Sequence, residues 1–206
     1  MNRAALSTSA AVLASMGGVW LAVHAPSAEA QEENLRAVLR DPSGQVVGTV
    51  KFSLDDRGTA VKVRLRPSTY VAAGAFHGLH VHANGDATNG SGCVADAGQP
   101  SSTWFVSADG HLTAPGVTHG QHAGDLPGPL VMADGFAHLR FTTDRVNPAD
   151  LLGRAVILHA KPDNLGNVPV GSEPNQYTPN GAAATDLTAR TGNAGDRVAC
   201  GVIERD

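Results

Sequence analysis

The sequence is poor in aromatic residues, which make up 4% of the chain, and it contains only two cysteines. It also has no long charge run and no basic patch, and its net charge is −4, so nucleic acid is not an expected partner. No convincing helical segment is found. The 24 glycines and 12 prolines instead favour short strands joined by many turns.

The first thirty residues have the layout of a secretory signal peptide. Met1-Asn2-Arg3 gives a positive start, an apolar run of small residues follows, and Ala28-Glu29-Ala30 offers a cleavage site. The alternative is a membrane anchor, although serines, a threonine and glycines interrupt the run. We therefore expect a signal peptide at 1–30, one domain at 31–206, and no stable membrane span after cleavage. The protein would be exported to the periplasm, the cell envelope or the medium.

Cys93 and Cys200 both follow the predicted signal. In an oxidising compartment they are expected to form one disulfide; two free buried thiols are the alternative.

Alternating apolar and polar residues predict short antiparallel strands. Val61, Val63 and Leu65, for example, alternate with Lys62, Arg64 and Arg66, as on a strand with one wet face. Strands are expected at 35–39, 45–54, 61–65, 80–82, 130–132, 137–141, 154–160 and 197–204. One helical turn is expected at 147–152, and two long polar loops at 84–127 and 161–196. The predicted fold is all-β: an eight-stranded antiparallel Greek-key barrel or sandwich with two long functional loops.

Histidines supply the chemistry. His80 and His82 stand two apart on a predicted strand, so both side chains project from one face, as a copper or zinc site requires. His119, His122 and Asp125 follow the pattern His-x-x-His-x-x-Asp, which offers three of the four ligands of a tetrahedral zinc site. Loop histidines that merely face solvent are the alternative for each member of this group.

Four separated motifs together resemble the secreted bacterial copper–zinc superoxide dismutases. They are His77-Gly78-Leu79-His80-Val81-His82 with Gly85-Asp86 and Cys93 beyond, His122-Ala123-Gly124-Asp125-Leu126-Pro127, Gly153-Arg154-Ala155-Val156-Ile157-Leu158-His159-Ala160, and Gly192-Asn193-Ala194-Gly195-Asp196-Arg197-Val198-Ala199-Cys200-Gly201-Val202. They occur in the family's order and cover nearly all of the chain after the signal.

The resemblance implies two metals, copper and zinc. It assigns copper to His80, His82, His111 and His159, and zinc to His111, His119, His122 and Asp125. His111 would bridge the two metals and serve in catalysis. Asp163 would link ligands of the two metals, and Arg197 would dock the anionic substrate beside copper. Cys93 and Cys200 match the family disulfide.

The implied reaction is disproportionation of superoxide to oxygen and hydrogen peroxide, with copper cycling between +2 and +1. On reduction, His111 would take up a proton and pass it to the departing peroxide. The implied substrate is superoxide. The sequence leaves open whether the chain forms a homodimer, because dimer contacts differ between branches of the family.

Two further histidines have other expected roles. His77 matches a family position that makes structural hydrogen bonds, and His138 alternates with apolar residues, so it is expected to face solvent.

The chain departs from the family pattern in three places. Asp109 replaces one glycine of the run before His111. The step from His119 to His122 is shorter than is common, which makes His119 the least secure ligand and zinc less secure than copper. The second loop carries few charges (Glu173, Asp186 and Arg190), which argues against strong electrostatic steering by that loop.

Two other functions are alternatives to the dismutase hypothesis. The first is a non-enzymatic copper- or zinc-binding module of the same fold. The second is a binuclear metallohydrolase, but those barrels need about 250 residues and alternating helices, which this chain lacks.

Overall fold

The computed structural model describes residues 34–90, 92–170 and 182–206. The predicted signal peptide and Glu173 lie outside these residues. Glu32–Asp206 forms one compact unit, which contains every element below. Among the described residues, none of the helices has both the length and the apolar character that a membrane crossing needs.

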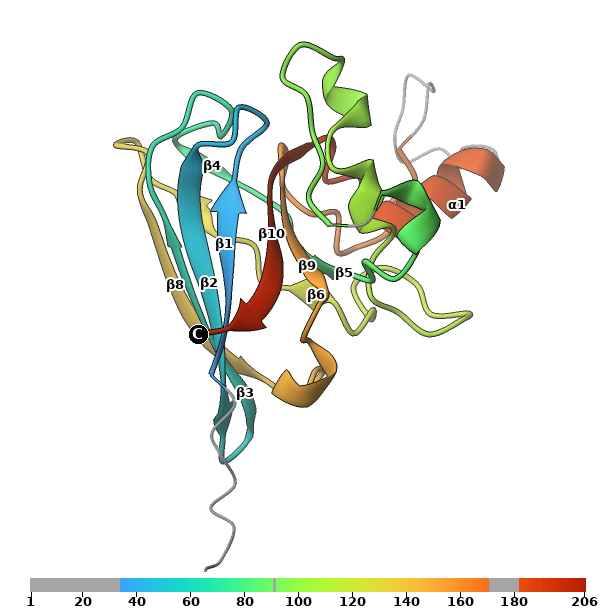
Figure 1. The fold of residues 1–206 in the computed structure, drawn as a ribbon. Coiled ribbons are helices and arrows are strands. Elements are labelled where there is room, and N and C mark those ends of the chain that lie inside the picture. The colour runs from blue at the N-terminus through green and yellow to red at the C-terminus, as the bar shows by residue number, and fades with distance from the viewer. Residues whose placement is uncertain (1–33, 91, 171–181) are drawn as a thin grey trace, which may run out of the picture. The chain divides into compact units, whose positions relative to one another are not determined.

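An antiparallel sheet of eight strands dominates the unit (Figure 1). Its strands in spatial order are β6 (Asp125–Leu126), β5 (Leu79–His82), β9 (Ala155–His159), β10 (Arg197–Arg205), β1 (Leu35–Arg40), β2 (Val46–Asp55), β3 (Gly58–Leu65) and β8 (Ala137–Thr143). The sheet curls, so β5 and β6 lie at one edge and β3 and β8 at the other. The all-β prediction is confirmed.

The apolar side of the strands forms the core. Val61, Val63 and Leu65 are buried, whereas Lys62 and Arg64 between them are exposed. The same cluster takes in Leu79 and Val81 from β5, which turn away from the histidines of that strand. Burying these side chains removes apolar surface from water and holds the sheet in its curled form.

Two predicted strands differ in detail. The segment predicted at 130–132 is β7 (Leu130–Val131), which pairs with β4 (Ala75–Phe76) in a separate two-stranded sheet. The eighth place in the main sheet belongs to β6, inside the first predicted loop, because Asp125 pairs with His80 there.

The loops contain short helices. The expected turn near 147–152 is confirmed as η4 (Pro148–Asp150), and the first long loop holds η1 (Ala87–Asn89), η2 (Ser101–Thr103) and η3 (Val106–Ala108). The expectation that the chain has no helix is wrong, because the second loop contains α1 (Ala182–Thr191). This segment begins with three alanines, the best helix-forming residue.

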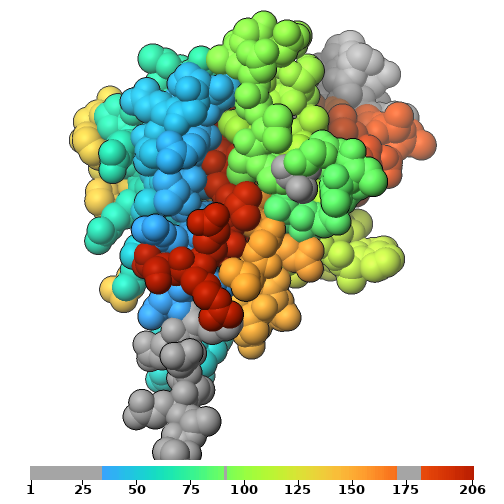
Figure 2. All heavy atoms as spheres, viewed as in Figure 1, coloured from blue at the N-terminus to red at the C-terminus, as the bar shows by residue number. Residues whose placement is uncertain are grey.

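The predicted disulfide is confirmed: Cys93 bonds to Cys200 and joins the first long loop to β10. In Figure 2, β10 (red) runs between the blue N-terminal strands and the green first loop.

Candidate metal centre

Strands β5 and β9 bring three histidines together. His80 and His82 project from the same face of β5, as their spacing predicts, and β9 pairs with β5 and ends at His159. All three side chains are almost completely buried. Burial disfavours the charged form of an imidazole, and it lowers the pKa of His82 and of His159 well below the ordinary value. Both rings are therefore neutral near pH 7.

Each of these rings has one nitrogen held by the protein. His80 Nε2 lies 2.9 Å from both carboxylate oxygens of Asp163, and His82 Nδ1 lies 2.8 Å from the carbonyl oxygen of Asp109. His159 Nδ1 lies 3.0 Å from the carbonyl oxygen of Gly195. These contacts fix the tautomer, because the held nitrogen donates its proton and the other nitrogen keeps a free lone pair.

The three remaining nitrogens are buried without a partner among the described residues: His80 Nδ1, His82 Nε2 and His159 Nε2. A buried polar atom without a hydrogen bond costs free energy, so three in one place indicate a missing ligand. With His111 they form a group whose ligand atoms lie within 4.8 Å of one another. An all-imidazole set of this kind fits a transition metal such as copper.

His111 reaches this group from the first loop. Its backbone forms a bridge with that of His82, and the next residue, Leu112, donates its N–H to the carbonyl oxygen of Val81 at 2.8 Å. The ring centroids of His80 and His111 are 4.0 Å apart. His111 Nδ1 faces the other way, 3.0 Å from Asp125 Oδ1. One ring therefore belongs to both clusters.

The second cluster is arranged around Asp125 Oδ1. The Nδ1 atoms of His111, His119 and His122 lie 3.0, 3.2 and 3.3 Å from this oxygen. His111 Nδ1 and His122 Nδ1 are 3.2 Å apart. Ligand atoms about 2.0–2.1 Å from a tetrahedral zinc ion are separated by about 3.3 Å, which these four distances match. His80 also adjoins this cluster, since it offers a ligand atom that lies within 4.8 Å of those of His111, His119 and Asp125.

The second loop compensates for the short step between His119 and His122. The backbone N–H of His119 donates to the carbonyl oxygen of Ala189 on α1 at 2.6 Å, and Asn167 Nδ2 donates to the carbonyl oxygen of His119 at 2.8 Å. Gly192 lies so close that a Cβ there would stand 2.1 Å from His119 Nε2. His119 is therefore well placed by the fold, although its spacing made it the least secure ligand.

Asp163 joins the two clusters. Its carboxylate accepts from His80 Nε2 and lies 3.3 Å from His119 Nε2. Burial raises the pKa of this carboxyl, but the hydrogen bonds to His119 and His80 outweigh burial and lower the pKa to about 2. Asp163 is thus a carboxylate that orients one ring in each cluster.

The two clusters differ in protonation. Burial lowers the pKa of His111 to about 4. Burial also pushes down the pKa of His119, but the hydrogen bonds to Asp125 and Asp163 outweigh burial and raise it to about 9. In the metal-free protein this charged His119 stabilises the fold below about pH 6.5, and the contribution is lost as the pH rises through about 9.

Zinc binding is therefore expected to release about one proton per ion near pH 7, because a metal ligand must be deprotonated. Copper binding at the first cluster should release much less than one proton per ion, since His82 and His159 are already neutral. Calorimetric titration of the metal-free protein in two buffers of different ionisation enthalpy measures the number. The His119→Gln variant is the control, and a wild-type zinc titration without proton release would contradict the charge assigned to His119.

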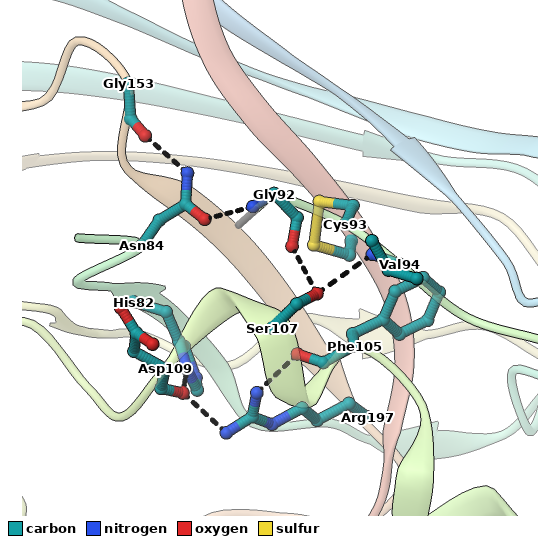
Figure 3. The surroundings of a disulfide bond; sticks show 11 residues. His82, Asn84, Gly92, Cys93, Val94, Phe105, Ser107, Asp109, Gly153 and Arg197 are labelled. Carbon is teal, nitrogen blue, oxygen red and sulfur yellow. Dashed lines mark hydrogen bonds between the residues drawn. A yellow bond between two sulfur atoms is a disulfide. The ribbon is translucent and has the colours of Figure 1, made fainter. Parts of the chain in front are cut away.

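Arg197, at the start of β10, points toward the first cluster (Figure 3). Its guanidinium donates to the carbonyl oxygens of Phe105 and Asp109, the latter at 2.6 Å. The Asp109 oxygen also accepts from His82 Nδ1, so one carbonyl group holds both the arginine and a ring of the cluster. This arrangement fixes a permanent positive charge beside the first cluster.

Asp109 was not predicted as a site residue. In the sequence it stood out only because it replaces a glycine of the family pattern. Its φ of 65° lies in the region that favours glycine. Its carboxylate accepts from the backbone N–H groups of Gly85 and Asp86, at 2.6 and 3.0 Å, and from Asn89 Nδ2. These bonds connect the start of the first loop to Asp109, whose carbonyl oxygen accepts from His82 and Arg197.

A cavity of 690 Å³ opens over the first cluster. Its lining includes His82, His111 and His159 together with Arg197. Arg190 and Thr191 of α1 contribute to its wall. A small molecule can therefore reach the first cluster, and a positive charge is positioned to receive an anion.

The two remaining histidines among the described residues, His77 and His138, behave as the sequence predicts. His77 is buried, and its ring nitrogens lie 2.7 and 2.8 Å from the carbonyl oxygens of His159 and Ala72, which makes it structural. His138 is exposed on β8.

Comparison with known proteins agrees with this geometry. Residues 46–203 match the family model described as copper/zinc superoxide dismutase. The chain is 36% identical to the superoxide dismutase [Cu-Zn] of Mycolicibacterium paratuberculosis, over 87% of this chain and 78% of that protein. It is 38% identical to that of Mycobacterium tuberculosis, over 83% and 70%, and 32% identical to an extracellular superoxide dismutase [Cu-Zn] of Brugia pahangi, over 81% and 73%.

Solved structures share the fold. A variant of a SOD-like protein from Bacillus subtilis aligns with a TM-score of 0.54 and 26% identity, covering 81% of this chain and 94% of that chain. The clock protein EA4 aligns with a TM-score of 0.58 and 24% identity, covering 85% and 96%, which supports the fold alone.

Proposed function

The chain belongs to the copper/zinc superoxide dismutase family, and we propose that its two histidine clusters hold the metals of that reaction. The protein is an oxidoreductase that converts two superoxide ions and two protons into oxygen and hydrogen peroxide. The observation that carries the assignment of residues is the convergence of three buried nitrogens, from His80, His82 and His159, which have no partner in the described part of the chain and lie beneath an open cavity.

The proposed copper ligands are His80, His82, His111 and His159. The proposed zinc ligands are His111, His119, His122 and Asp125. Copper supplies one-electron redox chemistry between +2 and +1, and zinc supplies a fixed charge of constant oxidation state. The tetrahedral spacing around Asp125 and the all-imidazole set on β5 and β9 support this division.

The residues of the chain have distinct tasks in the reaction. Arg197 binds the superoxide anion in the cavity, since its guanidinium keeps its charge and is held by two carbonyl groups. Whenever Nε2 of His111, the nitrogen that does not face Asp125, is not bound to a metal, it would take up a proton from water and pass it to the peroxide product. Asp163 keeps the rings of His80 and His119 in place throughout.

Replacing Arg197 by alanine should lower the rate of superoxide consumption by about tenfold and weaken its dependence on salt, because the docking charge is lost. Copper content should stay near normal, since the Arg197 guanidinium donates to two backbone carbonyl groups and is not a metal ligand. Stopped-flow assays at low and high salt measure this, with the metal content of each sample determined. An unaltered rate would remove Arg197 from the mechanism.

A non-enzymatic metal-binding module of the same fold is the competing function. It would need neither the arginine in the cavity nor the shared ring of His111, and both are in place. The absorption spectrum of the Cu(II) form with and without zinc distinguishes the two. A spectrum that zinc leaves unchanged would favour the non-enzymatic module. If His111 is shared, zinc binding to it should change the copper absorption.

We also propose that residues 1–30 are a cleaved signal peptide and that residues 31–206 act outside the cytoplasm. The disulfide supports this, since such bonds persist in oxidising compartments. The extracellular relative from Brugia pahangi agrees with it. A homodimer is compatible with the family and is tested by the mass of the purified protein in solution.

A further inference from the structure

A second surface of the protein is strongly basic although the chain as a whole is acidic, with a net charge of −4. It lies on the outer face of β2, β3 and β8, away from the metal centre. We call it the basic face; it consists of Lys51, Lys62, Arg64, Arg66, His138 and Arg140, all exposed.

The pairing of the strands creates this surface. Lys62 lies opposite Lys51 on one side and opposite Arg140 on the other, and Arg64 lies opposite His138. Adjacent strands are about 4.7–4.9 Å apart, so these side chains are direct neighbours. The expectation that the chain has no basic patch is therefore wrong. No basic run marks the surface in the sequence, because apolar residues alternate with the cations and three strands contribute.

Most of these cations are unpaired. Lys51 contacts Asp206, but the side chains of Lys62, Arg64, Arg66 and Arg140 make no ion pair or hydrogen bond with any described residue. Like charges directly opposite each other destabilise a sheet. The protein thus maintains an arrangement that costs stability and that a bound anion would relieve.

Protection of a sheet edge does not explain the arrangement. Charges on an edge strand prevent pairing with another chain, which would account for Arg140 on β8. Lys62 and Arg64 lie on β3, which is paired on both sides, with β2 and β8. Their charges are therefore available for a different purpose.

We propose that the basic face docks the protein on an anionic phospholipid surface. Three of the four unpaired cations are arginines, whose guanidinium group matches phosphate in a bidentate manner. They are spread in two dimensions over two strands, as a sheet of headgroups requires, rather than along one line as for a linear polyanion.

An exposed aromatic side chain adjoins the cations and favours a membrane over a soluble polyanion. Phe136, 43% exposed, precedes β8 and lines a cavity with Arg64, Arg66 and His138. Met132, also 43% exposed, lies nearby, since its N–H donates to the carbonyl oxygen of Phe136. Apolar side chains next to cations gain from the boundary between headgroups and acyl chains.

Docking through the basic face would leave the metal centre open. β3 and β8 form one edge of the sheet and β5 and β6 the other (Figure 1). The cavity over the first cluster lies on the β5 side and would remain accessible to a diffusing anion.

Sedimentation with vesicles tests the proposal. The proposed mature form, residues 31–206, is used, so that the apolar N-terminal segment cannot itself bind lipid; it contains the whole compact unit Glu32–Asp206. Vesicles of phosphatidylcholine alone are compared with vesicles containing about a third phosphatidylglycerol, at about 0.1 M salt. Binding is expected only to the second kind. Arg64→Gln should weaken it about fivefold and Arg64→Gln with Arg140→Gln about 25-fold, as each cation near the surface contributes about 1 kcal/mol.

Arg190→Gln on α1 is the control for net charge. Arg190 pairs with Asp186 outside the basic face, so its replacement should leave vesicle binding unchanged. Equal losses for Arg190→Gln and Arg64→Gln would overturn the proposal, because net charge alone would then be responsible. Equal binding to both kinds of vesicle, or no binding to either, would also overturn it. Heparin binding that depends on Arg64, without vesicle binding, would assign the basic face to a soluble polyanion instead. Thermal unfolding of each variant verifies that the fold is intact.

Discussion

Replacing His82 by alanine should reduce superoxide consumption by the copper-loaded protein at least about 100-fold. His82 Nε2 is one of the buried nitrogens of the first cluster that have no hydrogen-bond partner among the described residues, and its other nitrogen is already held by Asp109. Even residues that only orient a metal ligand cost 10–100-fold in affinity or activity when they are replaced, so loss of a ligand itself should cost more.

The measurement needs a matched control. Replacing the exposed His138 by alanine removes an imidazole from the far edge of the sheet and should leave the rate unchanged. Both variants are loaded with copper under the same conditions and their bound copper is counted. Unchanged superoxide consumption by His82→Ala would refute the assignment of the β5 histidines as copper ligands.

Replacing Cys93 and Cys200 together by serine should lower the free energy of unfolding by about 4–5 kcal/mol. The disulfide spans a sequence separation of 107 residues. In the chain-entropy model a loop of about 100 residues gives about 4.7 kcal/mol, because the crosslink restricts the unfolded chain.

The loss should also reach the metal centre. Val94, next to Cys93, accepts the backbone N–H of Phe105 at 2.8 Å, and the carbonyl group of Phe105 accepts from Arg197. Ser107 Oγ ties the same segment together by contacts with Gly92 and Val94 (Figure 3). Without the disulfide, one of the two carbonyl groups that hold Arg197 should be less firmly placed.

Chemical denaturation of the oxidised wild type and of the double variant gives the difference in stability. Adding a reductant to the wild type should reproduce the result, and adding it to the variant should change nothing. A difference below about 1 kcal/mol would contradict the entropic account of the crosslink.

The strands and the first cluster were predictable from local patterns. Alternation at 61–65 marked a strand with one wet face, and the two-residue spacing of His80 and His82 placed both rings on one side. These features depend only on the geometry of an extended chain, which is why they could be inferred from neighbouring residues.

Features that depend on distant segments could not be inferred in this way. His119 is held by Ala189 and Asn167, from a loop whose helix α1 was not predicted, although its three alanines are a usable signal. The basic face depends on which residues of β2, β3 and β8 stand opposite one another. Register between strands is set by the whole sheet, so local alternation alone cannot supply it.

The central claim is that the paired clusters form a superoxide dismutase centre in this chain. Its most direct test is superoxide decay followed by stopped flow while the zinc-loaded protein is titrated with copper. The decay rate should rise in proportion to bound copper and reach its limit at one copper per chain, since the first cluster offers a single set of ligands. Decay that stays at the rate of buffer after copper is bound would contradict the claim.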